Sequence, residues 1–247
     1  MVTYLVIGAS QGIGLALADA LSKNREDKVI ATQRKESTEL RKLTERKNVV
    51  ILNLDVADQK SIAEFGEKLK ATVDSIDIAI FNSAVAKATT PLLETTAESW
   101  TEHFVTNSLG PVLVYPQVHP LLLKSDIRKV FFMSSTAGSI QEQVPYPVDA
   151  YGASKAHLNY SVRKLSQELA GEHFTIVLLH PGTVSTNAFN AVVSILAGGD
   201  TELEEGARNM AITPETCAQQ ILAAIKALEE KDNGRFVQIS DLENVSF

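Results

Sequence analysis

Short apolar runs alternate with longer amphipathic segments along the whole chain. The short runs are rich in Val, Ile, Leu and Phe and show no regular polar–apolar alternation, which is typical of strands buried on both faces of a sheet. We therefore expect seven strands. They lie at residues 3–8, 28–33, 49–54, 76–82, 129–134, 175–180 and 235–239.

The amphipathic segments between these strands predict helices at residues 12–23, 37–46, 61–73, 97–124, 150–171 and 214–230. Strands that alternate with helices are typical of a parallel, doubly wound sheet with helices on both faces. No repeat, low-complexity tract or linker divides the sequence. The expected fold is a single α/β domain, residues 1–247, built as a three-layer α/β/α sandwich on a seven-stranded parallel sheet.

Two segments depart from this regular pattern. Pro111, Pro116 and Pro120 lie inside the longest expected helix, and proline within a helix kinks or interrupts it. Residues 188–212 are long for a connection and contain a Gly-Gly pair within a mixed apolar and acidic pattern. Because long insertions in compact domains are often functional, we expect this segment to be a substrate lid.

The composition narrows the class of protein. Hydrophobic residues make up 45% and charged residues 21% of the 247 positions, which allows a sizeable core. The net charge of −7 provides no basic field for nucleic acid or anionic lipid. The longest charge-free stretch, residues 103–123, is too polar and too interrupted by proline to span a bilayer. The sequence has a single cysteine, Cys217, and an N-terminus without a signal-peptide pattern, which predict a cytoplasmic protein. The negative charge and the lack of a spanning stretch predict no nucleic-acid or membrane partner.

A glycine-rich turn follows the first expected strand. Gly8, Gly12 and Gly14 open the first helix in the spacing G-x-x-x-G-x-G. Glycine lets the backbone approach a phosphate closely, and the free N–H groups of a helix start attract the anion. The same glycines would also serve tight packing of the helix on the strand. Their place directly after an N-terminal strand favours dinucleotide binding.

Polar residues mark the ends of two further strands, at the edge where such sheets bind ligands. Asp55 ends the third strand, where its carboxylate could accept a hydrogen bond from an adenine amino group. Alternatively it could cap the helix that follows, although Asp58 is better placed for that role. Asn82-Ser83-Ala84 ends the fourth strand and could line an adenosine ribose.

Tyr151 and Lys155 provide the strongest candidate chemistry. Residues four apart share one face of a helix, so we expect the Lys155 ammonium beside the Tyr151 phenol. A neighbouring cation lowers the pKa of a phenol, which would make Tyr151 an acid and base near neutral pH. Ser135 ends the fifth strand and could hydrogen-bond a substrate carbonyl. Asn107 lies in the long helix before that strand, where its amide must find partners through a local helix break or a water relay.

Together these residues resemble the short-chain dehydrogenase/reductases over essentially the whole chain. Asn107, Ser135, Tyr151 and Lys155 match the family's catalytic tetrad, and Pro181-Gly-Thr-Val-Ser-Thr186 matches the segment that contacts nicotinamide. The resemblance implies a Rossmann-type fold and no catalytic metal. It also implies a cofactor site that runs along the ends of the strands and onto the helix of Tyr151. The residues of this site are Gly8, Ser10, Gln11, Gly12, Ile13, Gly14, Arg34, Asp55, Val56, Asn82, Ser83, Ala84, Asn107, Tyr151, Lys155, Pro181, Gly182, Val184 and Thr186.

Two short sequence segments indicate which subfamilies this chain resembles. The stretches Val29-Ile-Ala-Thr-Gln-Arg34 and Asn107-Ser-Leu-Gly-Pro111 are similar to small carbonyl reductases of the C-factor type and to fungal norsolorinic-acid-ketoreductase-like proteins. Ala84 departs from the family, which usually has glycine there, and this departure puts the geometry of the turn in question. The segment between Ser135 and Tyr151 is also somewhat lengthened.

The resemblance implies hydride transfer between a nicotinamide and a carbonyl or secondary alcohol. Tyr151 would exchange the proton of the substrate oxygen, and Lys155 would lower the tyrosine pKa and bind the nicotinamide ribose. Ser135 would orient the substrate, and Asn107 would hold a water that connects Lys155 to solvent. Residues 84–87, 136–146 and 187–212 are expected to form the pocket walls. They are mostly small, apolar or proline, which predicts a small to medium, modestly hydrophobic substrate.

Two other functions remain open at this point. Sugar-nucleotide epimerases and dehydratases use the same tyrosine–lysine pair, but they usually carry a larger C-terminal domain than 247 residues allow. A non-catalytic cofactor-sensing regulatory or scaffold protein would share the fold, although a degraded tetrad would be expected there. The intact tetrad favours an enzyme.

The second strand bears on the choice of cofactor. NAD-binding members of this fold typically place an acid at its end, whereas here the strand ends in Gln33 and is followed by Arg34 and Lys35. A guanidinium can make charge-assisted hydrogen bonds to a 2′-phosphate. Either cation could instead pair with Glu36, and Gln11 adds no positive charge to the glycine turn. The missing acid favours NADP(H) over NAD(H).

The resemblance also implies self-association. The family commonly pairs through its two long helices, which here are residues 97–124 and 150–171. Leu158, Tyr160 and Val162 are expected on the outer turns of the second of these helices. We therefore expect a homodimer or homotetramer.

Overall fold

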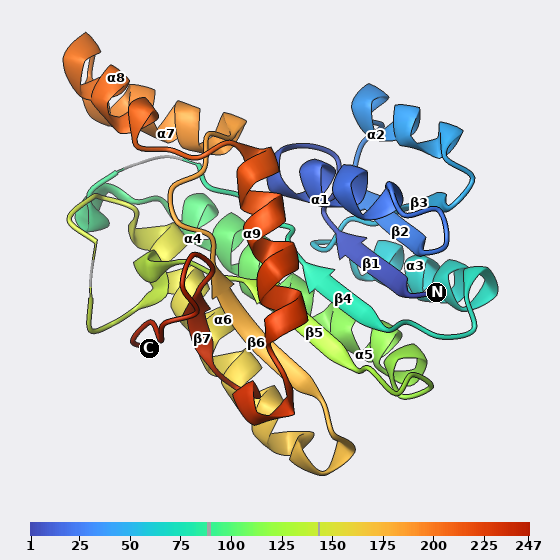
Figure 1. Cartoon of the computed structure of the whole chain (residues 1–247). Coiled ribbons are helices and arrows are strands. Elements are labelled where there is room, and N and C mark those ends of the chain that lie inside the picture. Colours follow the sequence, from blue (N-terminus) through green and yellow to red (C-terminus); the bar gives the residue numbers. More distant parts are fainter. Residues whose placement is uncertain (88–89, 143) are drawn as a thin grey trace.

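Seven parallel strands form one sheet within residues 1–87, 90–142 and 144–247, which the computed structural model describes (Figure 1). Their order across the sheet is β3-β2-β1-β4-β5-β6-β7. All seven lie where the apolar runs predicted them, with ends that differ by at most two residues. The strands are β1 Thr3–Ile7, β2 Lys28–Gln33, β3 Val49–Asn53, β4 Ile78–Phe81, β5 Lys129–Met133, β6 Thr175–His180 and β7 Phe236–Gln238.

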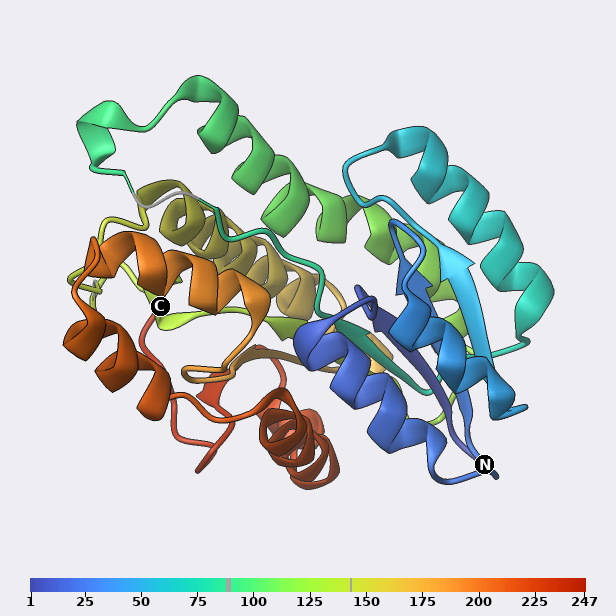
Figure 2. The ribbon, with the colours of Figure 1, turned by 90° about the horizontal axis from the view of Figure 1, so that it is seen from above.

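Helices cover both faces of the sheet, which confirms the predicted α/β/α sandwich (Figure 2). One face packs against α1 (Gly12–Ser22), α2 (Thr38–Lys42) and α9 (Pro214–Ala227). The opposite face packs against α3 (Gln59–Thr72), α5 (Gly110–Leu122) and α6 (Asp149–Glu168). Short 3-10 turns occur at Leu43–Glu45, Leu92–Glu94, Thr136–Gly138, Ala170–Glu172 and Glu230–Asp232.

The two cores are separated by the alternation of side chains along each strand. In β1, Leu5 and Ile7 belong to the core under α3, α5 and α6, while Val6 belongs to the core under α1 and α9. All three side chains are fully buried. Burial of each stabilises the fold by about 1.5–3 kcal/mol relative to exposure. This explains why the strands read as continuous apolar runs.

The longest predicted helix is divided into three parts. α4 (Ala97–Phe104) passes into a π-helical turn, Val105–Leu109, and then into α5. The expected interruption therefore falls just before Pro111, and its wider hydrogen-bond spacing contains Asn107. The prolines were expected to kink or interrupt the helix, and Pro116 and Pro120 do not interrupt it, because α5 continues through both.

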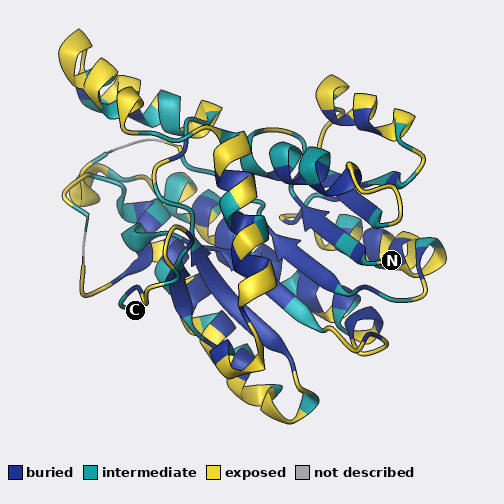
Figure 3. Cartoon of the chain, viewed as in Figure 1, coloured by how far each residue is buried: buried dark blue, intermediate teal, exposed yellow. Residues whose placement is uncertain are grey.

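The predicted insertion at residues 188–212 is mainly helical rather than a loop. α7 (Asn187–Ala197) ends at Gly198, which adopts φ +57°, and α8 (Thr201–Asn209) follows after Gly199. Figure 3 shows the strands as buried and most of α8 as exposed. In the described ranges, the structure contains no helix with the length and apolarity needed to cross a membrane.

Candidate active site

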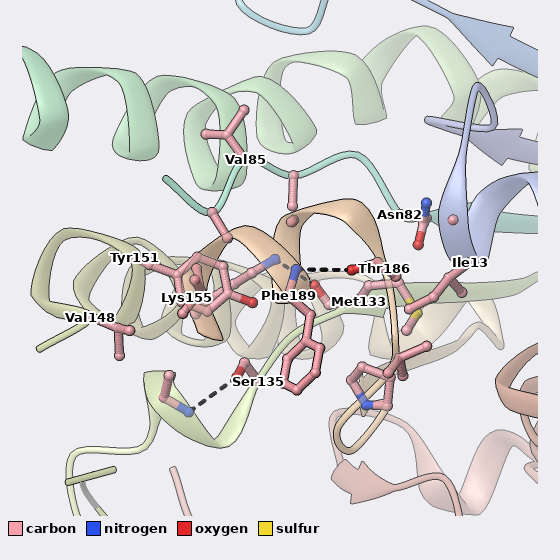
Figure 4. Close-up of a pocket in the computed structure, with 18 of the residues that line it drawn as sticks. Ile13, Asn82, Val85, Met133, Ser135, Val148, Tyr151, Lys155, Thr186 and Phe189 are labelled. Carbon is pink, nitrogen blue, oxygen red and sulfur yellow. Dashed lines mark hydrogen bonds between the residues drawn. The ribbon is translucent and has the colours of Figure 1, made fainter. Parts of the chain in front are cut away.

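A cleft of about 770 Å³ opens at the carboxyl ends of the strands, the edge where parallel α/β sheets bind ligands. Its walls include the glycine turn, the ends of β3 to β6, one face of α6 and the inner side of α7 and α8. Figure 4 shows Ile13, Asn82, Met133, Tyr151 and Phe189 around this cleft. Every predicted site residue lines this cleft except Gly14 and Asn107. The sequence-predicted site is thus brought together in one place.

The glycine turn is tight enough to exclude side chains. Gly8 adopts φ +84°, and a Cβ added there would lie 2.7 Å from the Cα of Ser83. A Cβ on Gly14 would lie 2.6 Å from the amide nitrogen of Asn82 and would also meet the carbonyl oxygen of Gly8. Packing of the turn on β4 therefore requires both glycines, whether or not a phosphate binds. Gly14 lies behind the cleft for this reason.

The N-terminus of α1 faces the cleft with its first turn open. No side chain caps it, and no acidic residue lies in its first turn. Gly12 and Ile13 from this turn line the cleft. Open N–H groups and the positive end of the helix dipole favour an anion at this position.

Polar side chains hold the strand ends around the turn. The hydroxyl of Thr32 accepts a hydrogen bond from the Gly8 N–H (2.9 Å), and the Asn82 amide donates one to the Gly8 carbonyl (2.8 Å). Asp55 lines the cleft and accepts a hydrogen bond from the N–H of Ala57, whereas Asp58 caps α3, as predicted. Ala84 has no left-handed backbone conformation. The alanine therefore fits this turn without strain.

The two serines after β5 have different environments. The Ser134 hydroxyl is buried and donates to the side chain of Asn159 in α6. Ser135 lines the cleft, and its hydroxyl accepts a hydrogen bond from the N–H of Ala137 at 3.2 Å. Ser135 therefore presents a hydroxyl to a ligand, and Ser134 stabilises the strand end.

Tyr151 and Lys155 both lie on the cleft face of α6 (Figure 4). The Lys155 side chain is 2% exposed, and its Nζ donates to the carbonyl oxygen of Met133 at 2.8 Å. The same Nζ lies 5.7 Å from the centroid of the Tyr151 ring. The Lys155 ammonium therefore lies near the Tyr151 phenol, as predicted.

The predicted effect of Lys155 on the tyrosine is wrong for this structure. Burial raises the pKa of Tyr151, and the hydrogen bond with the Ser135 hydroxyl opposes that rise in part. Burial also lowers the pKa of Lys155 to about 8. Loss of water is the largest cause of both shifts, and Lys155 is not among the causes of the shift at Tyr151. As a consequence the phenol keeps its proton at neutral pH, the form needed for a proton donor.

Asn107 reaches the segment after β4 from the π-helical turn. Its amide nitrogen donates to the Val85 carbonyl (2.8 Å) and to the Ser154 hydroxyl (3.0 Å), and its oxygen accepts from the Val85 N–H (2.7 Å). Both amide hydrogens are therefore committed to protein atoms. The predicted helix break supplies the partners of Asn107. Any water held through its side chain would have to use the remaining lone pair of the oxygen.

The segment after β6 connects the cleft to the helical insertion. Pro181, Gly182, Val184 and Thr186 line the cleft, and the Thr186 hydroxyl caps α7 by accepting from the Phe189 N–H. Ser185 and Ile212 are joined because the Ser185 N–H donates to the Ile212 carbonyl at 2.9 Å. The two ends of the insertion therefore lie side by side.

The inner side of the insertion is apolar. Apart from Asn187 at the start of α7, the cleft residues on α7 and α8 are apolar and repeat at helical spacing: Ala188, Phe189, Val192, Val193, Leu196, Leu203 and Ala207, with Met210 just beyond. Opposite them lie Val144, Pro145, Tyr146 and Pro147. Of the three predicted walls, 84–87 lines the cleft throughout, whereas 187–212 lines it along one face of its helices. Within the described part of 136–146, from which residue 143 is missing, the cleft residues are Thr136, Ala137, Val144, Pro145 and Tyr146.

Two histidines near the cleft were not anticipated from the sequence. His103 is fully buried at the end of α4 and packs edge-to-face with Tyr151. His180 ends β6 and lines the cleft. Burial lowers the pKa of His180 to about 4, so its ring is neutral. The position of His180 directly before Pro181 marked it as a strand-end residue, whereas nothing in the sequence distinguished His103 from an ordinary helix residue. No group of three or more metal-ligating side chains occurs among the described residues.

This chain is similar to known proteins in both its sequence and its fold. The family model for short chain dehydrogenases matches residues 2–195. An uncharacterized oxidoreductase of Saccharomyces cerevisiae is 39% identical and covers 99% of this chain and 97% of the yeast protein. Norsolorinic acid ketoreductase of Dothistroma septosporum is 27% identical, covering 97% of this chain and 90% of that protein.

Among solved structures, the NADPH-bound carbonyl reductase from chicken fatty liver matches with a TM-score of 0.86 at 25% identity. The match covers 99% of this chain and 94% of the chicken protein. Together with the family model, it confirms the family that the glycine turn and the tyrosine–lysine pair predicted. The chain belongs to the short-chain dehydrogenase/reductase family and is an oxidoreductase that uses a nicotinamide cofactor.

Proposed function

We propose that this protein is an NADP(H)-dependent carbonyl reductase that acts on small to medium, hydrophobic aldehydes or ketones and can run in reverse on secondary alcohols. One observation carries the proposal. A protonated Tyr151, the Ser135 hydroxyl and the buried Lys155 share one cleft with the glycine turn. A substrate carbonyl placed there would meet a proton donor and a hydrogen-bonding hydroxyl beside a dinucleotide site.

The residues around the glycine turn fit a dinucleotide. The open first turn of α1 suits a pyrophosphate, and Gly8 and Gly12, which line the cleft there, carry no side chain. Among the described residues, the hydroxyl oxygen of Ser83 is buried without a hydrogen-bond partner. Ser83 lines the cleft and packs directly against Gly8, and a ligand bound beside this turn would offer the hydroxyl the partner that it lacks.

The chain's own residues would orient the substrate and move the proton. When bound, the nicotinamide supplies or accepts the hydride. Ser135 would hold the substrate oxygen, and Tyr151 would donate its proton to that oxygen as negative charge develops. Lys155 is fixed to the Met133 carbonyl, which places its ammonium at the floor of the cleft to bind a ribose hydroxyl and to stabilise the phenolate that remains.

The choice of NADP(H) rests on the end of β2. Arg34 lines the cleft, and no acid lies within ion-pair distance of Arg34 or Lys35 in the parts of the chain that are described. The pairing with Glu36 that the sequence allowed is thus absent there. The Gln33 side chain accepts from the Ser37 N–H and donates to Asn53. A free guanidinium without a competing carboxylate favours a 2′-phosphate.

The apolar lining of α7 and α8 supports a hydrophobic substrate. None of the α7 and α8 residues that line the cleft is charged, and Lys87, which also lines it, is paired with Glu102. A carboxylate or phosphate on the substrate would find no free cation there. A neutral alkyl or aryl carbonyl compound would instead remove apolar surface from water.

A cofactor-oxidation assay tests this proposal directly. Purified protein is mixed with NADPH and a panel of aldehydes, ketones, quinones and ketosteroids, and the loss of NADPH absorbance is followed. We expect turnover with apolar carbonyl compounds and none with the Tyr151→Phe variant. If no compound of the panel oxidises NADPH or NADH while both cofactors bind, a cofactor-sensing role replaces this proposal.

We also propose self-association through α4, α5 and α6. The earlier expectation that Leu158 and Val162 face outward is wrong, because both are buried in the core, and only Tyr160 of the three is exposed. Phe104 and Val112 remain partly exposed on α4 and α5. Light scattering at micromolar concentration should give a dimer or tetramer mass, and Tyr160→Glu should shift it toward the monomer. A monomer mass for the unaltered protein would reject this interface.

A further inference from the structure

Two side chains one helical turn apart hold the segment that follows β4. Asn107 pairs with both the N–H and the carbonyl of Val85, and His103 accepts a hydrogen bond from the N–H of Lys87 at 3.2 Å. Val85 and Lys87 are two residues apart, and together with Ala86 they line the cleft. The α4 helix and the π-helical turn therefore fix one wall of the cleft through side chains.

The hydrogen bonds of His103 require one form of its ring. Its Nδ1 lies 2.7 Å from the carbonyl oxygen of Ser99, which can only accept. Its Nε2 faces the Lys87 N–H, which can only donate. The ring must therefore be neutral with its proton on Nδ1. The ring is fully buried, with Nδ1 anchored to its own helix and Nε2 bonded to the wall.

The same ring also packs against the proposed proton donor. The ring centroids of His103 and Tyr151 are 6.5 Å apart with an interplanar angle of 79°. This edge-to-face arrangement is favourable for aromatic pairs. His103 therefore touches the tyrosine ring and, through Lys87, the wall beside it.

We propose that His103 is a positioning residue that sets both the Tyr151 ring and the 85–87 wall. The proposal rests on the proposed carbonyl reductase function, and it assigns two separable effects to one side chain. The ring contact controls where the phenol lies, and so it controls kcat. The hydrogen bond to Lys87 controls the wall, and so it controls KM for the substrate. Misplacement of reacting groups by about 1 Å can reduce a rate by ~100-fold, so even small shifts are measurable.

Three variants separate the two contacts. His103→Phe keeps an aromatic ring against Tyr151 but has no acceptor for Lys87. His103→Gln keeps an acceptor but has no ring. His103→Leu has neither. His157→Gln is the matched control, because His157 also packs edge-to-face with an aromatic ring, Phe104, but is exposed and outside the cleft.

We expect His103→Phe to raise KM about tenfold with kcat largely kept, and His103→Gln to lower kcat about tenfold with KM largely kept. His103→Leu should show both effects, and His157→Gln neither. Rates are normalised to the NADPH-binding sites found by fluorescence titration, so that unfolded protein does not count. Hydrogen exchange of the Lys87 amide, followed by NMR, should be slow in the unaltered protein and in His103→Gln and faster in His103→Phe.

The outcomes distinguish the two proposals. If the unaltered protein oxidises no cofactor with any carbonyl compound, the proposed function fails, and the exchange of the Lys87 amide still tests the wall contact. If the unaltered protein is active and all three His103 variants keep its kcat and KM per binding site, the positioning role is rejected. A loss of thermal stability alone, with unchanged kinetics, also rejects it, because His103 would then serve only the fold.

Discussion

The glycine turn and the α7–α8 insertion lie on the same cleft but are held in different ways. The turn is bonded directly to neighbouring strands, since Gly8 is fixed by Thr32 and by Asn82. Five residues of the adjoining helix α1 are buried. In contrast, α8 buries none of its residues. The insertion is held at its two ends, by a contact between Asn187 and Gln11, and by burial of Val193 and Ala197 of α7.

This difference separates two tasks within one cleft. A cofactor with constant structure is served by a turn whose backbone cannot move without breaking strand contacts. Segments with few buried contacts open at lower free energy than the core does, which suits a wall that must admit varied substrates. The side chains proposed to be catalytic, Tyr151, Lys155 and Ser135, lie between these regions, on α6 and at the end of β5. Variants on each side should therefore affect binding, chemistry and mobility separately.

The largest effect is expected at the proton donor. Tyr151→Phe removes one hydroxyl and leaves the ring packing in place, so cofactor binding at the glycine turn should be kept. General acid catalysis contributes roughly 10²–10⁴-fold, and kcat should fall by that factor. NADPH fluorescence titration and steady-state turnover measure the two properties. Near-normal turnover in the variant would remove Tyr151 from the mechanism.

A smaller effect with the opposite pattern is expected at Arg34. Arg34→Asp should weaken NADPH binding at least tenfold, which corresponds to about 1.4 kcal/mol, and leave NADH binding similar or improved. Lys35→Asp is the matched control, because it makes the same charge change on a residue that does not line the cleft. Titration of both cofactors decides the matter. If the unaltered protein prefers NADH, the lack of an acid at the end of β2 does not indicate NADP(H) binding.

The two regions also differ in how far the sequence could predict them. Strand ends, the glycine turn and the tyrosine–lysine pair depend on short spacings, and the structure places them where expected. No helix was predicted in the long connection that contains α7 and α8, because the Gly198-Gly199 pair marks a break without revealing that both flanks are helical. The raised pKa of Tyr151 depends on burial by residues distant in sequence, which spacing alone does not report. The contacts of His103 with Lys87 and Tyr151 join three separate elements and carry no local signal.

Substrate preference should show a modest dependence on the insertion. In a series of alkyl ketones, kcat/KM should rise by up to about fourfold per added methylene, because each buried CH₂ contributes about 0.8 kcal/mol. Leu203→Ser should flatten that rise, since Leu203 lines the cleft. Ile195→Ser is the control, as Ile195 is exposed on α7 and faces away from it. The same slope in both variants would place the substrate elsewhere.

The smallest expected effect is a change in the mobility of the insertion. Arg208 is the only lysine or arginine within residues 187–212, so trypsin can cut there at one position only. The Arg208 side chain bonds Glu204 in α8 and Ser194 in α7, which joins the two helices. These two contacts must open before trypsin can bind the arginine. If the insertion is a lid that closes over the cofactor, NADPH should slow this cut severalfold. Cleavage after Lys231, far from the cleft in a 3-10 turn, should be unaffected and serves as the reference. Mass spectrometry of the fragments gives both rates from one digest. Equal rates at Arg208 with and without NADPH would make α7 and α8 a fixed wall, and the comparison between a rigid turn and a mobile lid would no longer hold.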